Sequence, residues 1–133
     1  MNYLDLLEEA KKASAMAYAP YSQFPVGAAL LTASGEVFTG CNVENASYGL
    51  TICAERVAVT KAVSAGFREF KAIAVFAPTG EPVSPCGACR QVLAEFSPDG
   101  EVIMGNGKGD YVVAKVAELL PGAFSLKTDK NSR

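Results

Sequence analysis

Three cysteines and one glutamate stand out in the sequence as residues that could do chemistry together. Cys53 is followed two residues later by Glu55, and Cys86 and Cys89 form a CxxC pair. Each group lies where a helix is expected to begin, and the backbone N–H groups at a helix N-terminus lower the pKa of a thiol. Three thiolates converging from two such ends could bind zinc tetrahedrally and leave one position open, as a catalytic zinc requires.

Glu55 is close enough in sequence to this metal site to act on water held there. A carboxylate two residues away from a ligand points in a different direction, as is needed for a group that accepts a proton from the water. The chain contains no histidine. This excludes Ser-His-Asp and Cys-His catalytic arrangements, as well as every metal site that needs imidazole.

Two other interpretations of the cysteines are open at this stage. A CxxC pair at the start of a helix is typical of a thiol oxidoreductase, but that leaves Cys53 and Glu55 without a role. A zinc-ribbon-like interaction module would use Cys41 as a fourth ligand and close the site to water. Because Cys41 ends a predicted hairpin strand, we expect it to be a small buried side chain instead.

Length, composition and charge narrow the class of protein. Half of the 133 residues are hydrophobic and a fifth are charged, which predicts a single globular domain over residues 1–126 and a frayed tail over 127–133. The formal net charge of −2 provides no basic field for a nucleic acid. Charged residues near the N-terminus argue against a signal peptide, and no segment is apolar for long enough to span a bilayer. We therefore expect a cytoplasmic protein with neither a nucleic-acid nor a membrane partner.

The elements that must position these residues follow from the apolar periodicity and the turn residues. The pattern predicts helices over about 2–17, 52–65 and 86–96, and strands over 26–33, 36–41, 71–77, 101–105 and 111–116. The first two strands form a hairpin, and the order strand, helix, strand over residues 71–106 predicts a parallel pair. The expected fold is α/β, with a mixed five-stranded sheet between two layers of helices.

Two of the chemical strings together match a known signature. Cys-Ala-Glu at 53–55 and Pro-Cys-Gly-Ala-Cys at 85–89 have the form and separation found in zinc-dependent deaminases, in their three-cysteine version. Three further strings are FPVGAAL at 24–30, NVENASYG at 42–49 and ELLPGAF at 118–124. With all five strings in order over nearly the whole chain, the sequence resembles the cytidine deaminase family in its small homotetrameric form, and a cytidine deaminase-like fold is expected.

The resemblance implies a hydrolytic reaction and a set of site residues. Zinc-bound hydroxide would attack C4 of cytidine or deoxycytidine while Glu55 moves the protons, giving uridine or deoxyuridine and ammonia. One zinc per chain would be held by Cys53, Cys86 and Cys89. The implied substrate contacts are Phe24 on the pyrimidine, Asn42 and Glu44 on the ribose hydroxyl, and Ala54, with Tyr48 and Phe124 reaching the sites of neighbouring subunits in a homotetramer.

Positive charge is expected beside the metal ligands. Three thiolates and a dication leave one net negative charge, which makes the metal a poorer Lewis acid than one with a histidine ligand. Arg56 lies three residues after Cys53, and Arg90 lies next to Cys89. Either guanidinium group could donate charge-assisted hydrogen bonds to sulfur and withdraw part of that charge.

Overall fold

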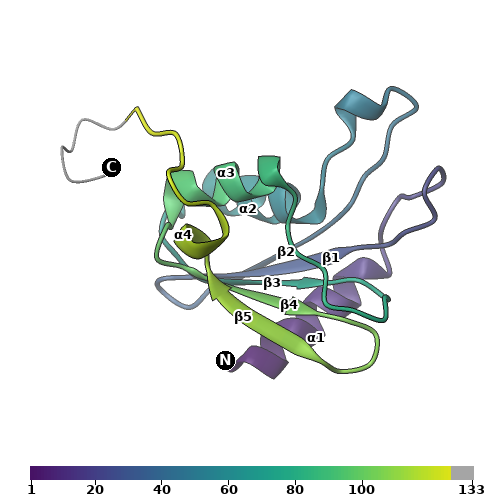
Figure 1. The fold of residues 1–133 in the computed structure, drawn as a ribbon, viewed down its shortest axis with the longest axis horizontal. Coiled ribbons are helices and arrows are strands. Elements are labelled where there is room, and N and C mark those ends of the chain that lie inside the picture. Colours follow the sequence, from purple (N-terminus) through teal and green to yellow (C-terminus); the bar gives the residue numbers. More distant parts are fainter. Residues whose placement is uncertain (127–133) are drawn as a thin grey trace.

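A mixed five-stranded sheet forms the middle layer of the protein in the computed structural model, which describes residues 1–126 (Figure 1). Its strands are β1 (Gly27–Thr32), β2 (Val37–Cys41), β3 (Phe70–Phe76), β4 (Glu101–Gly105) and β5 (Tyr111–Lys115), in the order β2-β1-β3-β4-β5. Strands β3 and β4 are parallel, whereas the other neighbouring pairs are antiparallel. The predicted sheet, hairpin and parallel pair are confirmed; the expected frayed tail lies outside the described residues.

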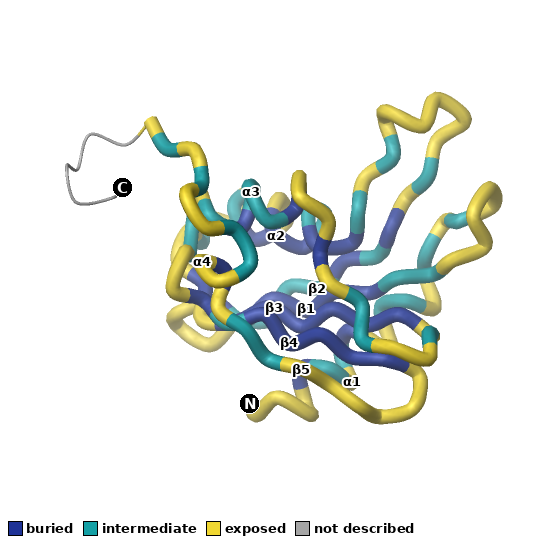
Figure 2. Tube along the Cα trace, in the orientation of Figure 1, coloured by how far each residue is buried: buried dark blue, intermediate teal, exposed yellow. Residues whose placement is uncertain are grey.

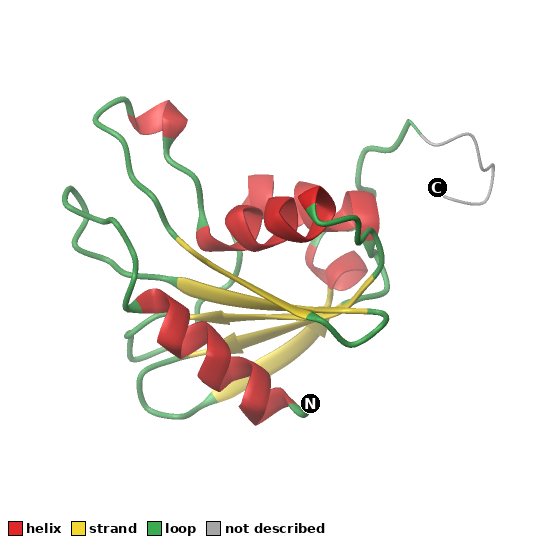
Figure 3. Cartoon of the chain, turned by 180° about the vertical axis from the view of Figure 1, so that it is seen from behind, coloured by secondary structure: helices red, strands yellow, loops and turns green. Residues whose placement is uncertain are grey.

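Helices cover both faces of the sheet (Figure 3). On one face lies α1 (Tyr3–Ser14); on the other lie α2 (Ala54–Ser64), α3 (Gly87–Phe96) and α4 (Val116–Leu119). Side chains alternate between the two faces along each strand, and this divides the hydrophobic core into two clusters, one on each face of the sheet. Leu30 and Val75 pack with α2 and α3, whereas Ala29 and Ala74 pack under α1. The three-layer α/β/α arrangement is confirmed.

Helix α1 begins as predicted but ends three residues earlier than predicted. Asn2 caps it, because its side chain accepts a hydrogen bond from the Asp5 backbone N–H, and the Asp5 carboxylate bonds back to the Asn2 backbone. The chain then turns away because Tyr18 pairs with Val43 in an isolated β-bridge.

Within the described residues, no helix is long and apolar enough to cross a membrane.

Two long loops rise from the sheet at the end where α2 begins, and both are exposed over most of their length (Figure 2). Residues 15–26 connect α1 to β1, and residues 42–53 connect β2 to α2. The second loop contains a short helix, η1 (Tyr48–Leu50), where the sequence predicted only loop. Helix α4 was also not predicted. Elements of three or four residues are too short to show a hydrophobic period.

Candidate metal centre and active site

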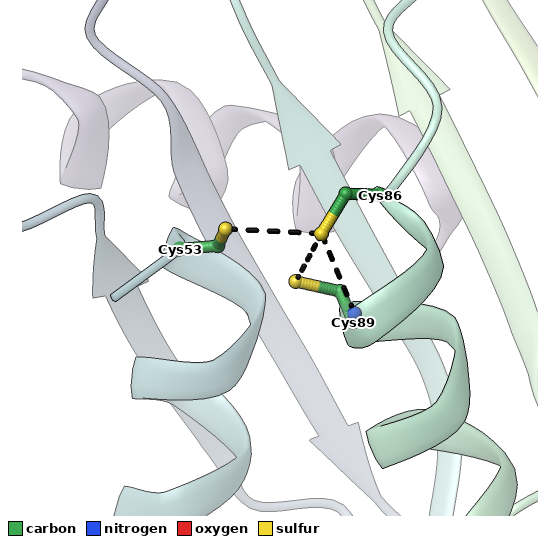
Figure 4. Close-up of side chains that lie close together, drawn as sticks. All are labelled: Cys53, Cys86 and Cys89. Atoms are coloured by element: carbon green, nitrogen blue, oxygen red, sulfur yellow. Dashed lines mark hydrogen bonds between the residues drawn. The ribbon is translucent and has the colours of Figure 1, made fainter. Parts of the chain in front are cut away.

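Cys53, Cys86 and Cys89 come together where α2 and α3 begin (Figure 4). Cys53 and Cys86 are the N-caps of the two helices, and Cys89 lies in the first turn of α3. The sulfur of Cys86 is 3.9 Å from that of Cys53 and 3.4 Å from that of Cys89, and all three lie within 4.8 Å of one another. Zn–S bonds of about 2.3 Å in a tetrahedron place two sulfur atoms about 3.8 Å apart. The cluster therefore fits one zinc ion.

Cys41 does not belong to this cluster. It ends β2, where it pairs with Gly27. Its neighbour Gly40 packs directly against α2, and side chains alternate between the two faces of a strand, so Cys41 faces the side of the sheet that α1 covers. It is partly rather than fully buried, because β2 is an edge strand. The four-cysteine interaction module is therefore wrong for this chain.

Glu55 lies in the first turn of α2 and is only 5% exposed. Burial raises the pKa of its carboxyl group, and the negative charge of the nearby Cys53 raises it further, whereas a hydrogen bond with Cys89 lowers it. The net raised pKa lets a buried carboxyl group hold a proton closer to neutral pH than an exposed one. This is the property required of a group that accepts and returns protons during a reaction.

Arg56 lies against Cys53 of the three-cysteine cluster. Its Nη2 donates hydrogen bonds to the Cys53 sulfur at 3.5 Å and to the Thr51 carbonyl oxygen at 3.3 Å. The pKa of Cys53 is lowered to about 5. The largest cause is its hydrogen bond with Cys89, and the hydrogen bond from Arg56 contributes less. The bond with Cys53 and burial raise the pKa of Cys89. The two pKa values shift in opposite directions because the two thiols share a hydrogen bond, and zinc binding requires both as thiolates.

Arg90 bonds to backbone and hydroxyl oxygens. Its Nε donates to the Pro85 carbonyl at 2.9 Å, its Nη1 to the Leu119 carbonyl at 2.8 Å, and its Nη2 to the Ser84 hydroxyl at 2.6 Å. The expected hydrogen bond to a thiolate is not among these. Arg90 instead ties the segment before Cys86 to the end of α4.

Asn42 and Glu44 join the two long loops. The Asn42 amide accepts from the Val26 N–H at 2.9 Å and donates to the Phe24 carbonyl at 2.8 Å. The Glu44 carboxylate accepts from the backbone N–H groups of Tyr21 and Ser22, at 2.9 and 3.1 Å, and from the Ser22 hydroxyl. The hydroxyl and backbone hydrogen bonds of Ser22 hold the pKa of Glu44 below its usual value. Both side chains therefore have fixed orientations.

Comparison with known proteins decides the family. Residues 2–106 match the family model described as the cytidine and deoxycytidylate deaminase zinc-binding region. The chain belongs to this family. It is a zinc-dependent deaminase with one zinc per chain, held by the three-cysteine cluster.

Individual relatives agree with this assignment over nearly their whole length. A cytidine deaminase from Sporosarcina psychrophila is 58% identical over 126 residues, which cover 94% of this chain and 93% of the relative. A cytidine deaminase from Halalkalibacterium halodurans is 59% identical over 123 residues, which cover 92% of this chain and 93% of the relative. The crystal structure of cytidine deaminase from Burkholderia pseudomallei superposes with a TM-score of 0.91 at 56% identity and covers 93% of this chain and all of that one.

The aromatic residues expected to contact substrate lie at the surface of the single deaminase chain. Phe24 is 37% exposed, Tyr48 75% and Phe124 62%. The Tyr48 ring packs edge-on against Tyr21, with centroids 6.1 Å apart. By contrast, Ala54 is fully buried at the start of α2.

Ser22 is a residue of this deaminase that the sequence analysis did not single out. Its hydroxyl group bonds to Glu44, and it accepts from the Phe24 N–H at 3.1 Å. The available signal was its position two residues before Phe24 in a polar loop. A serine in a loop is too common to indicate a role without the structure.

Proposed function

We propose that this deaminase hydrolyses cytidine and deoxycytidine to uridine and deoxyuridine, releasing ammonia. The observation that carries the proposal is the buried Glu55 next to a three-sulfur metal site, which Cys41, the other cysteine of the described residues, does not join. The high identity to proteins named cytidine deaminase supports the choice of substrate.

The chain's own residues account for the proton movements. Zinc bound by the three cysteines would lower the pKa of water towards about 7 and supply hydroxide for attack at C4 of the pyrimidine. Glu55 takes up the proton of that water and delivers it to N3 of the ring. It then takes the other proton of the water from the new hydroxyl group on C4 and carries it to the departing amino group, so that the C4 carbonyl forms and ammonia leaves as a neutral molecule.

Recognition of the nucleoside falls to the two loops. The Phe24 ring would stack on the pyrimidine, and Asn42 and Glu44 would hold the ribose hydroxyl. Although the Glu44 carboxylate already accepts three hydrogen bonds, its two oxygens offer about four lone-pair positions. The negative charge would repel a phosphate group at this place, so free nucleosides are favoured over nucleotides and polynucleotides.

We also propose a homotetramer in the cytoplasm whose active sites include Tyr48 and Phe124 of neighbouring subunits. Exposed apolar side chains are concentrated on the two loops: Met16, Tyr18, Tyr21, Phe24, Val43, Tyr48, Leu50 and Ile52. An apolar patch of this kind on a single chain is typical of a protein–protein interface. The thiol ligands would stay reduced in the cytoplasm.

The test is turnover by the zinc-loaded protein of cytidine, deoxycytidine and a cytosine-containing single-stranded oligonucleotide, followed by ultraviolet absorbance and ammonia release. We expect both nucleosides to be converted and the oligonucleotide to be inert. No turnover of either nucleoside by protein with one zinc per chain would refute the proposed activity. Comparable rates on cytidine and the oligonucleotide would refute the proposed selection for free nucleosides.

A further inference from the structure

The Glu44 carboxylate is held by the segment that leads into Phe24, and Ser22 makes most of these contacts. We propose that Ser22 is a positioning residue for the nucleoside, because it fixes the Glu44 carboxylate in the orientation that receives the ribose hydroxyl. This inference rests on the proposed contact between Glu44 and the ribose. Under this proposal Ser22 affects KM and takes no part in the proton transfers.

The hydrogen bonds fix both oxygens of Glu44. The backbone N–H groups of Tyr21 and Ser22 donate to Oε1 at 2.9 and 3.1 Å, and the Ser22 hydroxyl donates to Oε2. With a donor on each oxygen, the carboxylate cannot rotate about its last bond without losing a charge-assisted hydrogen bond. A long side chain held in advance does not have to lose this freedom when the nucleoside binds.

The direction of the hydrogen bond between the Ser22 hydroxyl and Glu44 follows from which of the two groups carries a proton. A hydroxyl group has one proton and two lone pairs. Since the Ser22 oxygen accepts from the Phe24 N–H at 3.1 Å, its own proton is free to point at Glu44, which as a carboxylate can only accept. Ser22 thereby connects the backbone of the residue expected under the pyrimidine with the side chain expected on the ribose. It sets the separation of the two contacts.

The backbone of Glu44 is fixed independently of Ser22. Its N–H donates to the Tyr18 carbonyl at 2.8 Å, and the Tyr18 N–H donates to the Asn42 carbonyl at 3.0 Å. Val43 pairs with Ile52, the residue before the ligand Cys53, through two hydrogen bonds of 2.9 Å. Removing the Ser22 hydroxyl should therefore release the carboxylate while leaving the loop and the metal centre in place.

The chain contains a matched control for this substitution. Ser34, in the turn between β1 and β2, donates its hydroxyl to the Glu36 carboxylate, which also accepts from Thr32 Oγ1 at 2.6 Å. This is the same kind of contact at the other end of the hairpin from the two loops. Ser34→Ala thus removes an equivalent serine–glutamate hydrogen bond without touching the site.

The experiment measures kcat and KM for cytidine with Ser22→Ala, Ser22→Thr, Ser34→Ala and Glu44→Gln. For Ser22→Ala we expect KM to rise roughly 3- to 10-fold, the effect of one hydrogen bond, with kcat within about twofold and zinc content unchanged. Ser22→Thr should restore KM because it keeps the hydroxyl, and Ser34→Ala should leave it unchanged. The inhibition constant of 2′,3′-dideoxycytidine, which lacks the 2′- and 3′-hydroxyls, should be the same for Ser22→Ala and the unmodified enzyme.

The outcomes separate this inference from the function on which it rests. If Glu44→Gln raises KM and Ser22→Ala does not, the role of Ser22 is refuted and the ribose contact stands. If neither substitution changes KM, the ribose contact is itself wrong, and the role of Ser22 falls with it. If Ser22→Ala weakens dideoxycytidine as much as cytidine, Ser22 supports the loop as a whole, and the proposal is likewise overturned.

Discussion

At the scale of single residues, Glu55 is a carboxyl group that is only 5% exposed. Burial and the neighbouring Cys53 raise the pKa of its carboxyl group, which suits a group that shuttles protons near neutral pH. Glu55→Gln keeps the size of the side chain but cannot accept and return a proton. We expect the variant to fold and to retain one zinc per chain, with kcat lowered by about 10² to 10⁴. Metal analysis measures the zinc content, and an absorbance assay measures kcat. Near-normal turnover would exclude Glu55 as the proton carrier.

We expect Arg56 to act on the metal through Cys53. Its hydrogen bond to the Cys53 sulfur would withdraw electron density and partly offset the excess negative charge of three thiolates. For Arg56→Gln we expect a lower kcat, loss of zinc to a chelator roughly 10- to 100-fold faster, and little change in KM. Arg68→Gln, at an exposed position, is the control. A raised KM with unchanged kcat and zinc retention would instead make Arg56 a substrate-binding residue.

The site residues differ in how far the sequence could predict them. The cysteines and Glu55 form two compact strings at helix starts, and the match of both strings to a known signature predicted that they meet. Arg56 is three residues from Cys53 on α2, so the two side chains share a helix face and meet as predicted. Arg90 is adjacent to Cys89 in α3, and consecutive helix residues point about 100° apart. Proximity in sequence therefore could not place its guanidinium group on the sulfur.

At the scale of elements, the metal centre depends on how closely α2 approaches the sheet. A Cβ atom on Gly40 would lie 2.5 Å from the Ala54 carbonyl oxygen and 2.7 Å from the Ala58 nitrogen. Both are backbone atoms of the helix and cannot move alone. A side chain at position 40 would therefore push away the first turn of α2, which carries Glu55 and follows Cys53, whereas the ligands on α3 would stay in place.

This dependence predicts different outcomes for two similar substitutions. Gly40→Ala should destabilise the protein by about 1–3 kcal/mol and also accelerate zinc loss and lower kcat. Gly27→Ala creates an equivalent clash, 1.9 Å from the Ala10 carbonyl oxygen, but on the α1 face. We expect it to lower the free energy of unfolding while zinc retention and kcat of the folded protein stay unchanged. Denaturant titration, chelator kinetics and activity measure the three quantities; equal zinc loss in both variants would contradict the prediction.

Most elements could be predicted because their signals are local. The continuous apolar run that becomes β1 and the Ser34-Gly35 turn specify the hairpin, and Asn2 specifies the start of α1. The end of α1 could not be predicted, since it depends on the pairing of Tyr18 with Val43, 25 residues further along the chain. Such long-range contacts override local propensity.

At the scale of the whole molecule, the two loops that carry the expected substrate contacts also hold many of the exposed large apolar side chains of residues 1–126. In a single chain, Tyr48 is 75% and Phe124 62% exposed. The Phe124 carbonyl accepts a hydrogen bond of 2.9 Å from Gln91 Nε2, two residues after the ligand Cys89. The same helix therefore contributes to the metal centre and holds the segment that would reach a neighbouring subunit.

Mixed oligomers test whether active sites combine residues from different subunits. A Glu55→Gln chain still supplies Tyr48 and Phe124, and a Tyr48→Ala/Phe124→Ala chain still supplies Glu55 and zinc. If neighbours complete each other's sites, co-expressed chains with separate tags should assemble oligomers more active than either parent, because some sites then contain every group. The control pairs Glu55→Gln with Arg56→Gln, whose defects lie in the same chain's part of the site, and should show no gain. Activity between the two parents in the first mixture would mean that each site is built from one chain.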